Sequence, residues 1–289
     1  MRTEFMTDAN TKETAQISDR GYTILDGVIP AAQVDQVRQA CVEAQARGHA
    51  RATAEREAIQ KLGHRVGVDG VDSMRGVINE TQSFAPYVAD KRLLSVVEHF
   101  FGPWIRISCT DCVINRPGCG RGYWHSDWPY NQTNASHIPA PYPDVLMHLA
   151  TIWMLTDFAG ENGGTLLVPG SHRSGVNPSD GMAEGVDRDS ALPDEIHAEG
   201  KAGSVLLYDS RLWHAVAPNQ SDSDRVALII RYAPWWLNLE PTRAGSDEHE
   251  MMVIDTDGKD YNQPQVTQQA YAALPANVQP LYRHWVERG

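Results

Sequence analysis

Apolar and polar positions follow a helical period in the first third of the chain. Apolar residues recur every three or four positions over 31–47 and again over 93–101, and both patterns predict amphipathic helices. Residues 50–62 have the same spacing but are too polar to contribute much to a core. The segment 21–29 is different, because its β-branched and aromatic residues predict a short strand that ends at Pro30.

From Trp104 onward the pattern becomes that of short strands. Clusters of Gly, Pro, Asn and Asp separate the apolar runs, and few long helical patterns interrupt them. Many short strands joined by such turns favour an antiparallel sandwich or barrel. The predicted strands are 104–115, 145–156, 164–168, 204–208 and 226–234.

The chain carries no internal repeat and no low-complexity linker that would mark a domain boundary. We expect a flexible tail over 1–18, followed by a single domain over 19–289, a size that one enlarged hydrophobic core can serve. Within it we expect a helical part at about 30–102 and a β core at about 104–236. The stretch 172–200 is rich in Gly, Ser, Asp and Pro and lacks periodicity, so it is predicted to be a long loop that closes over a site as a lid.

Charge and hydropathy exclude two classes of partner. The 25 Lys and Arg residues against 37 Asp and Glu residues give a net charge of −12, and no basic block is present that would track a phosphate backbone. No apolar run approaches the ~20 residues that a membrane helix needs, and no apolar leader follows Met1. We therefore expect a soluble, cytoplasmic protein with a small-molecule partner rather than nucleic acid or membrane. Its oligomeric state is not indicated.

Three of the four cysteines lie close together in sequence and suggest a zinc cluster at first sight. Cys109 and Cys112 occupy one predicted strand, where residues three apart point to opposite faces of the sheet. They are therefore poorly placed to share a metal ion, and no second C-x2-C pair matches them. Reduced thiols are the simpler prediction.

The stronger metal-binding pattern consists of His125, Asp127 and His214. On an extended segment residues two apart project from the same face, so His125 and Asp127 can approach one ion. His214 follows a strand and a turn in an aromatic stretch and would be the third ligand. Two histidines and one carboxylate form the facial triad that leaves open positions on Fe(II). Arg225 opens a buried apolar run, where its guanidinium would need an anion such as the distal carboxylate of 2-oxoglutarate.

Other interpretations of the same residues remain open at this point. His214 would also suit a core position bonded to a backbone carbonyl, and Arg225 would also suit a surface turn beside Asp222 or Asp224. Two other functions would use the same features: a non-catalytic jelly-roll protein that binds a metabolite, or a hydrolase with zinc on the same triad. A buried cation behind the metal argues against the binding protein.

Five segments, in order, resemble the phytanoyl-CoA dioxygenase family, which includes ectoine hydroxylases and many natural-product oxygenases of secondary metabolism. The most distinctive segment runs Asn-Gly-Gly-Thr-Leu-Leu-Val-Pro-Gly-Ser-His over 162–172. The other four are 21–29, 84–94, 124–127 and 213–225. The resemblance implies a mainly β fold with flanking helices, a double-stranded β-helix or jelly roll.

The resemblance also implies an activity. His125, Asp127 and His214 would bind Fe(II), and Arg225 would bind 2-oxoglutarate. With O2, such a dioxygenase oxidises an unactivated C–H bond of a small metabolite, most simply by hydroxylation, and releases succinate and CO2. Desaturation, cyclisation and epimerisation begin with the same hydrogen abstraction. Family members commonly carry a serine two residues after the distal histidine, where this chain has Val216.

Further side chains near these motifs are candidates for binding the co-substrate or the substrate. Thr110 or Thr165 would supply a hydroxyl to 2-oxoglutarate in place of the missing serine. Trp128, Trp213 and Trp235 flank the ligand motifs and would form an aromatic wall for the substrate. Because few basic residues lie near the motifs, we expect a small neutral or cationic substrate rather than an acyl-CoA.

Overall fold

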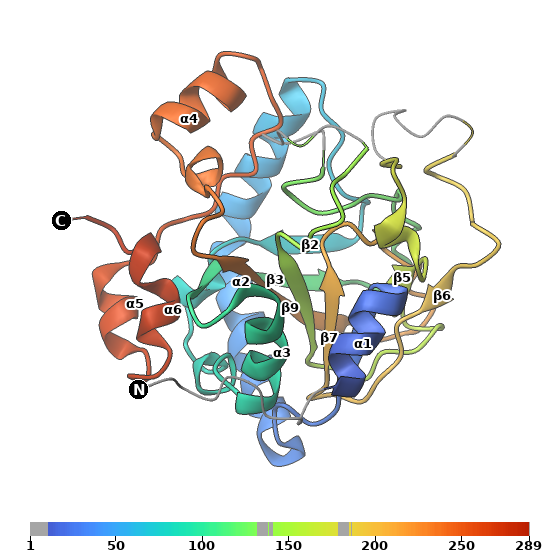
Figure 1. The fold of residues 1–289 in the computed structure, drawn as a ribbon, viewed down its shortest axis with the longest axis horizontal. Coiled ribbons are helices and arrows are strands. Elements are labelled where there is room, and N and C mark those ends of the chain that lie inside the picture. The colour runs from blue at the N-terminus through green and yellow to red at the C-terminus, as the bar shows by residue number, and fades with distance from the viewer. Residues whose placement is uncertain (1–10, 132–137, 139–140, 179–184, 186, 289) are drawn as a thin grey trace.

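Two antiparallel sheets form the centre of the molecule (Figure 1). The structure is a computed structural model and describes residues 11–131, 138, 141–178, 185 and 187–288. The larger sheet has the order β1 (Tyr22–Leu25), β7 (Val205–Asp209), β4 (Leu149–Met154), β9 (Arg225–Pro234), β3 (Ile105–Asn115) and β2 (Val71–Met74). The smaller sheet has the order β6 (Ile196–His197), β5 (Leu166–Leu167) and β8 (His214–Ala215).

Helices cover the outer face of the larger sheet. Figure 1 shows α5 and α6 on the opposite side of the molecule from β5. The α-helices are α1 (Thr11–Arg20), α2 (Ala31–Lys61), α3 (Lys91–Phe101), α4 (Asp247–His249), α5 (Gln268–Ala273) and α6 (Gln279–Tyr282). Single turns of 3-10 helix are η2 (Val77–Asn79), η3 (Ala85–Tyr87), η4 (Ser171–Arg173), η6 (Glu240–Thr242) and η8 (Arg283–Trp285), and η7 (Glu250–Ile254) is a π-helix. None of the described helices is long and apolar enough to span a membrane.

The side chains of strand β9 point alternately to the two faces of the larger sheet. Val226, Leu228 and Ile230 belong to the main core, which the sheet forms with α2, α3 and α6. Ala227 and Ile229 alternate with them and pack in a second cluster on the other face. Because successive side chains of a strand point to opposite faces, the odd-numbered residues of β9 point toward the smaller sheet. We call this the inner face.

A bulge in β3 decides which of its residues reach the inner face. The pairing of β3 with β9 shifts register between Ile107 and Cys109, so one extra residue is accommodated there. Ile107 lies in the helix-side core, and so does Cys112 farther along the strand. Without the bulge the odd-numbered residues would continue to face the helices. With it, Cys109 and Asp111 turn to the inner face.

The predicted strands and the helix over 93–101 are confirmed, and three expectations for other segments are corrected. The expected tail over 1–18 contains α1 from Thr11 onward, because Ile17 is buried in the main core, and residues 1–10 lie outside the described part. The two separate helical patterns join into the single helix α2. The expected loop over 172–200 includes β6, which pairs with β5, while its residues 179–184 and 186 lie outside the described part.

Candidate metal centre

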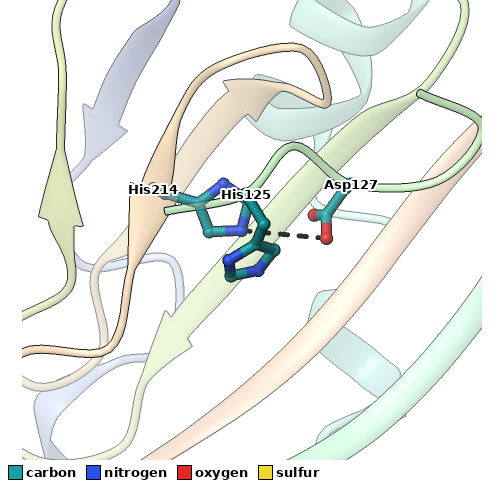
Figure 2. A group of neighbouring side chains, drawn as sticks. All are labelled: His125, Asp127 and His214. Atoms are coloured by element: carbon teal, nitrogen blue, oxygen red, sulfur yellow. Dashed lines mark ion pairs between the residues drawn. The ribbon is translucent and has the colours of Figure 1, made fainter. Parts of the chain in front are cut away.

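The three predicted metal ligands meet on the inner face (Figure 2). One ligand atom from each of His125, Asp127 and His214 lies within 4.8 Å of the others, and no other group of this kind occurs among the residues that the structure describes. Figure 2 shows the three side chains pointing toward one another, with His214 at the start of β8 and the other two on one extended segment. The prediction that H-x-D and a distant histidine converge is therefore consistent with the geometry.

Backbone pairing brings the two histidines together. The N–H of His125 donates to the carbonyl of His214 at 3.1 Å, and the N–H of His214 donates back at 3.0 Å. His214 in turn stands opposite Leu167 of β5, whose side chain packs in the inner cluster. Opposed residues in antiparallel strands share a face, so both imidazoles point inward. Asp127, two residues after His125, keeps the same face.

Carbonyl oxygens set the orientation of both imidazoles. Nδ1 of His214 lies 2.9 Å from the carbonyl of Leu212, and Nδ1 of His125 lies 3.1 Å from the carbonyl of Tyr123. A carbonyl only accepts, so each Nδ1 carries the proton and each Nε2 keeps a lone pair for a metal. The sequence also allowed His214 to be a core histidine bonded to a backbone carbonyl. That hydrogen bond is present, and it orients the ring as a metal ligand requires. Burial, followed by the neighbouring His214, lowers the pKa of His125 to about 3, so this imidazole is neutral.

Asp127 receives hydrogen bonds at both carboxylate oxygens. Arg231 donates to Oδ1 at 2.7 Å and Tyr208 donates to Oδ2 at 2.9 Å, while Nε2 of His214 lies 3.7 Å from Oδ1. Burial alone would raise the pKa of Asp127, but Arg231 and the two histidines outweigh it and lower the pKa to about 2. Arg231 was not predicted from the sequence. It lies six residues after Arg225 on the same predicted strand, so both side chains point to the same face.

Arg225 is buried on the inner face without an anionic partner. Its side chain is 4% exposed, its guanidinium lies 4.6 Å above the ring of Phe158, and no ion pair or hydrogen bond links it to any described residue. Burial lowers the pKa of Arg225 to about 10. The alternative of a surface cap does not apply, since Asp224 pairs with Arg116 instead.

A cavity of ≈ 520 Å³ opens beside the metal ligands. His125, Asp127 and Arg231 are among the residues that line it. Others come from the C-terminal half of α2, from residues 66–73, from β3 and from the segment 241–263. Of the three predicted substrate-contacting tryptophans, Trp128 lines this cavity. The expectations for the other two are corrected.

Trp213 and Trp235 lie elsewhere. Trp213 packs with Trp124 and Ala215 on the opposite face of the smaller sheet, because it precedes the inward His214 by one residue. Trp235 follows the last residue of β9 and is 63% exposed. Neither is among the described residues that line the cavity.

The two predicted co-substrate hydroxyls have different surroundings. The Thr110 hydroxyl is hydrogen-bonded to the Tyr282 hydroxyl at 2.9 Å on the helix side of β3, which corrects the expectation that it contacts 2-oxoglutarate. Thr165 precedes Leu167 by two residues, and its carbonyl accepts a hydrogen bond from the N–H of Ala198 at 2.7 Å. Alternation along the extended chain therefore places Thr165 on the inner face, as it does Leu167. Val216, at the position of the family's serine, lines the cavity.

The remaining candidate ligands have structural partners. His148 lies 2.6 Å from the Ser108 hydroxyl through Nε2 and 2.8 Å from the Trp128 carbonyl through Nδ1, and burial lowers its pKa to about 4. All four cysteines are free and buried. Cys112 lies in the helix-side core while Cys109 lines the cavity, as expected for residues three apart on a strand.

Residues 17–227 match the family model described as phytanoyl-CoA dioxygenase. This match covers well over half of the chain. The chain belongs to the phytanoyl-CoA dioxygenase family. The resemblance drawn from the sequence motifs is thereby confirmed, and the matched region contains all three candidate ligands and Arg225.

Individual relatives agree with this placement. Dioxygenase af480 of Aspergillus fumigatus is 29% identical over 140 residues, which are 48% of this chain and only 40% of that relative. An ectoine dioxygenase of Nocardia farcinica is 26% identical over 243 residues, 77% of each protein. Among solved structures, HygX from Streptomyces hygroscopicus with nickel, 2-oxoglutarate and hygromycin B bound superposes with a TM-score of 0.59 at 17% identity, over 88% of this chain and 96% of that one. The predicted jelly roll with flanking helices is confirmed.

Proposed function

We propose that this phytanoyl-CoA dioxygenase family member is an Fe(II)- and 2-oxoglutarate-dependent dioxygenase that hydroxylates an unactivated C–H bond of a small metabolite. The observation that carries the proposal is the convergence of two imidazoles and a carboxylate, with one ligand atom of each within 4.8 Å of the others, beside a cavity. Iron bound there with 2-oxoglutarate and O2 would supply the oxidant, with release of succinate and CO2. The donor set fits, because two histidines and a carboxylate on one face leave positions for co-substrate and oxygen.

Arg225 supports 2-oxoglutarate as the co-substrate. A buried guanidinium without an acidic partner is costly, and a dicarboxylate that extends from the metal would supply the missing charge. Arg225 and Arg231 share the inner face of β9, but only Arg231 is paired with an acid. The Thr165 hydroxyl, on the same inner face, is the candidate second contact. HygX, which has the same fold, was crystallised with nickel and 2-oxoglutarate.

Tyr208 and Arg231 have a supporting role in this proposal. Their hydrogen bonds hold Asp127 ionised and fix the direction of its carboxylate. Asp127 also occupies the position that a halide would need, so hydroxylation is favoured over halogenation. Trp128, in the cavity wall next to the ligands, would contact the substrate and help to exclude water.

The test is anaerobic titration of the purified protein with Fe(II) and 2-oxoglutarate. Chelation of iron by the keto acid gives a weak charge-transfer band in the visible region, and we expect this band in the wild type and its loss in His214→Ala. His197→Ala is the matched control, since His197 also precedes a carboxylate by two residues but binds the carbonyl of Gly164. Arg225→Met should retain metal binding and weaken 2-oxoglutarate binding. A wild-type band in His214→Ala would overturn the proposal.

A further inference from the structure

One acidic residue of the cavity wall has no ion pair. The described wall contains five acids, and four of them pair with arginines: Glu55 with Arg75, Asp69 with Arg56, Asp72 with Arg116, and Asp127 with Arg231. Asp111 lies within ion-pair distance of none of the described cations. It is therefore the carboxylate of this wall that has no direct ion-pair partner among the described residues. Lys259, a further cation of the wall, contacts Tyr123 and Tyr261 instead.

The position of Asp111 is set by the bulge in β3. The bulge turns Asp111 to the inner face, where it lines the same cavity as His125 and Asp127. The residue is 8% exposed, and Oδ1 accepts a hydrogen bond from the N–H of Gly76 at 3.2 Å. Burial raises the pKa of Asp111, although Arg231, a side-chain hydrogen bond with Cys109 and Arg75 oppose this effect. A buried carboxylate in this position would be stabilised by a hydrogen-bond donor of a ligand that enters the cavity.

We propose that Asp111 binds a protonated amine of the substrate. The proposal rests on the proposed function, because it assumes that the substrate occupies this cavity beside the metal. The nearby cations Arg75 and Arg231 already donate to Glu55 and Asp127, and Lys259 donates to the Tyr123 hydroxyl. An ammonium group from the ligand would therefore be the direct ion-pair partner that Asp111 lacks. An anionic group in the same place would face the Asp111 carboxylate at a cost. The cavity wall also contains Trp128, and the faces of aromatic rings attract cations. The rings of Tyr123 and Tyr261 already carry cations of the protein itself.

The first arm of the test uses the wild-type protein and matched pairs of ligands. Cyclohexylamine is compared with cyclohexanol, and benzylamine with benzyl alcohol, by anaerobic calorimetry on protein loaded with Fe(II) and 2-oxoglutarate. We expect each amine to bind about 10- to 100-fold more tightly than its alcohol, as for a hydrogen bond to a charged group. Equal binding of the two members, or tighter binding of the alcohols, overturns the proposal. A preference for alcohols would assign Asp111 to a neutral hydroxyl instead.

The second arm uses Asp111→Asn, which keeps the shape and the acceptor for Gly76 but removes the charge. We expect the preference for amines to fall to about that of the alcohols, while the charge-transfer band with Fe(II) and 2-oxoglutarate is retained. Asp35→Asn, on the exposed surface of α2, is the control and should keep the full preference. An unchanged preference in Asp111→Asn overturns the proposal. If Asp111→Asn does not fold, Asp111→Glu replaces it, and we expect Asp111→Glu to keep part of the preference for amines over alcohols.

The two proposals fail in different ways. If the band never forms in the wild type, the proposed function fails, and the amine preference is then measured on the metal-free protein. If the band forms but amines have no advantage, the proposed function stands and the role of Asp111 is wrong.

Discussion

The guanidinium of Arg231 lies 2.7 Å from Oδ1 of Asp127, the carboxylate of the candidate metal site. The two residues come from segments that are far apart in the sequence and meet only on the inner face of the larger sheet. Ala150 of β4 pairs with Arg231 of β9 on one side and with Tyr208 of β7 on the other. The Tyr208 hydroxyl donates to the other carboxylate oxygen of Asp127. The ligand is therefore charged and oriented by the fold before any metal binds.

Replacing Arg231 should destabilise the metal-free protein. In Arg231→Gln the carboxylate of Asp127 stays buried without its counter-ion, and removal of one partner of a buried pair costs about 3 kcal/mol. A divalent cation replaces the missing charge, so Ni(II) should restore more stability to the variant than to the wild type. Urea unfolding with and without Ni(II) measures both effects. Arg38→Gln, which breaks an exposed pair with Asp35, should change stability by less than about 0.5 kcal/mol. Equal gains from Ni(II) in the variant and the wild type would contradict the prediction.

The hydroxyl of Tyr208 should contribute to metal affinity. Tyr208→Phe removes the hydrogen bond to Oδ2 of Asp127 and leaves the ring in place, and loss of such a contact to a metal ligand weakens binding about 10- to 100-fold. Tyr232→Phe is a matched control, because its buried hydroxyl donates to the carbonyl of Val88 on the helix side. Competitive titration with Ni(II) compares the dissociation constants. The prediction is wrong if both variants lose affinity equally.

A hydroxyl at position 216 should strengthen 2-oxoglutarate binding. Val216 lines the cavity where other family members commonly have serine, and Val216→Thr adds a hydroxyl to a side chain of nearly the same shape. One further hydrogen bond to the co-substrate should lower its dissociation constant by about 3- to 10-fold. Val216→Ala controls for lost packing and should give no gain. Spectroscopic titration under anaerobic conditions measures all three proteins, and weaker binding by the threonine variant would exclude a carboxylate at this position.

Half-buried His284 should make the protein less stable in acid. Burial and the nearby Arg106 lower the pKa of His284 to about 3, whereas histidine in an unfolded chain titrates near 6.5. Between these values the unfolded state binds the additional proton, so the free energy of unfolding falls as the pH falls from about 6.5 toward 3. His284→Gln should reduce this dependence by up to about 1.4 kcal/mol per pH unit.

Urea unfolding at pH 7.5, 6.0 and 5.0 measures the slope for His284→Gln. His99→Gln, on the exposed side of α3, should retain the slope of the wild type. An identical slope in all three proteins would mean that His284 does not titrate differently on folding.

The sequence by itself determined the features that depend on local periodicity. The strand pattern after Trp104 follows from the period of two, and the same period places His125 and Asp127 on one face. Arg225 could be assigned to a buried position because it opens an apolar run. These inferences need only the geometry of a single strand. His214 was predicted as the third ligand from its place in an aromatic stretch after a strand and a turn, and the family motifs supported this choice, but no local rule fixes its contact with the pair.

Only the tertiary structure decided which distant side chains meet. Asp111 and Cys109 face the cavity because of one bulge in β3, and Arg231 reaches Asp127 because β9 lies between β3 and β4. Trp213 and Trp235 stand beside the motifs in sequence but point away from the cavity or into solvent. The physical reason is that adjacency along a chain fixes only the face of a strand. Register, bulges and the order of strands fix what that face opposes, and these depend on contacts between segments far apart in the sequence.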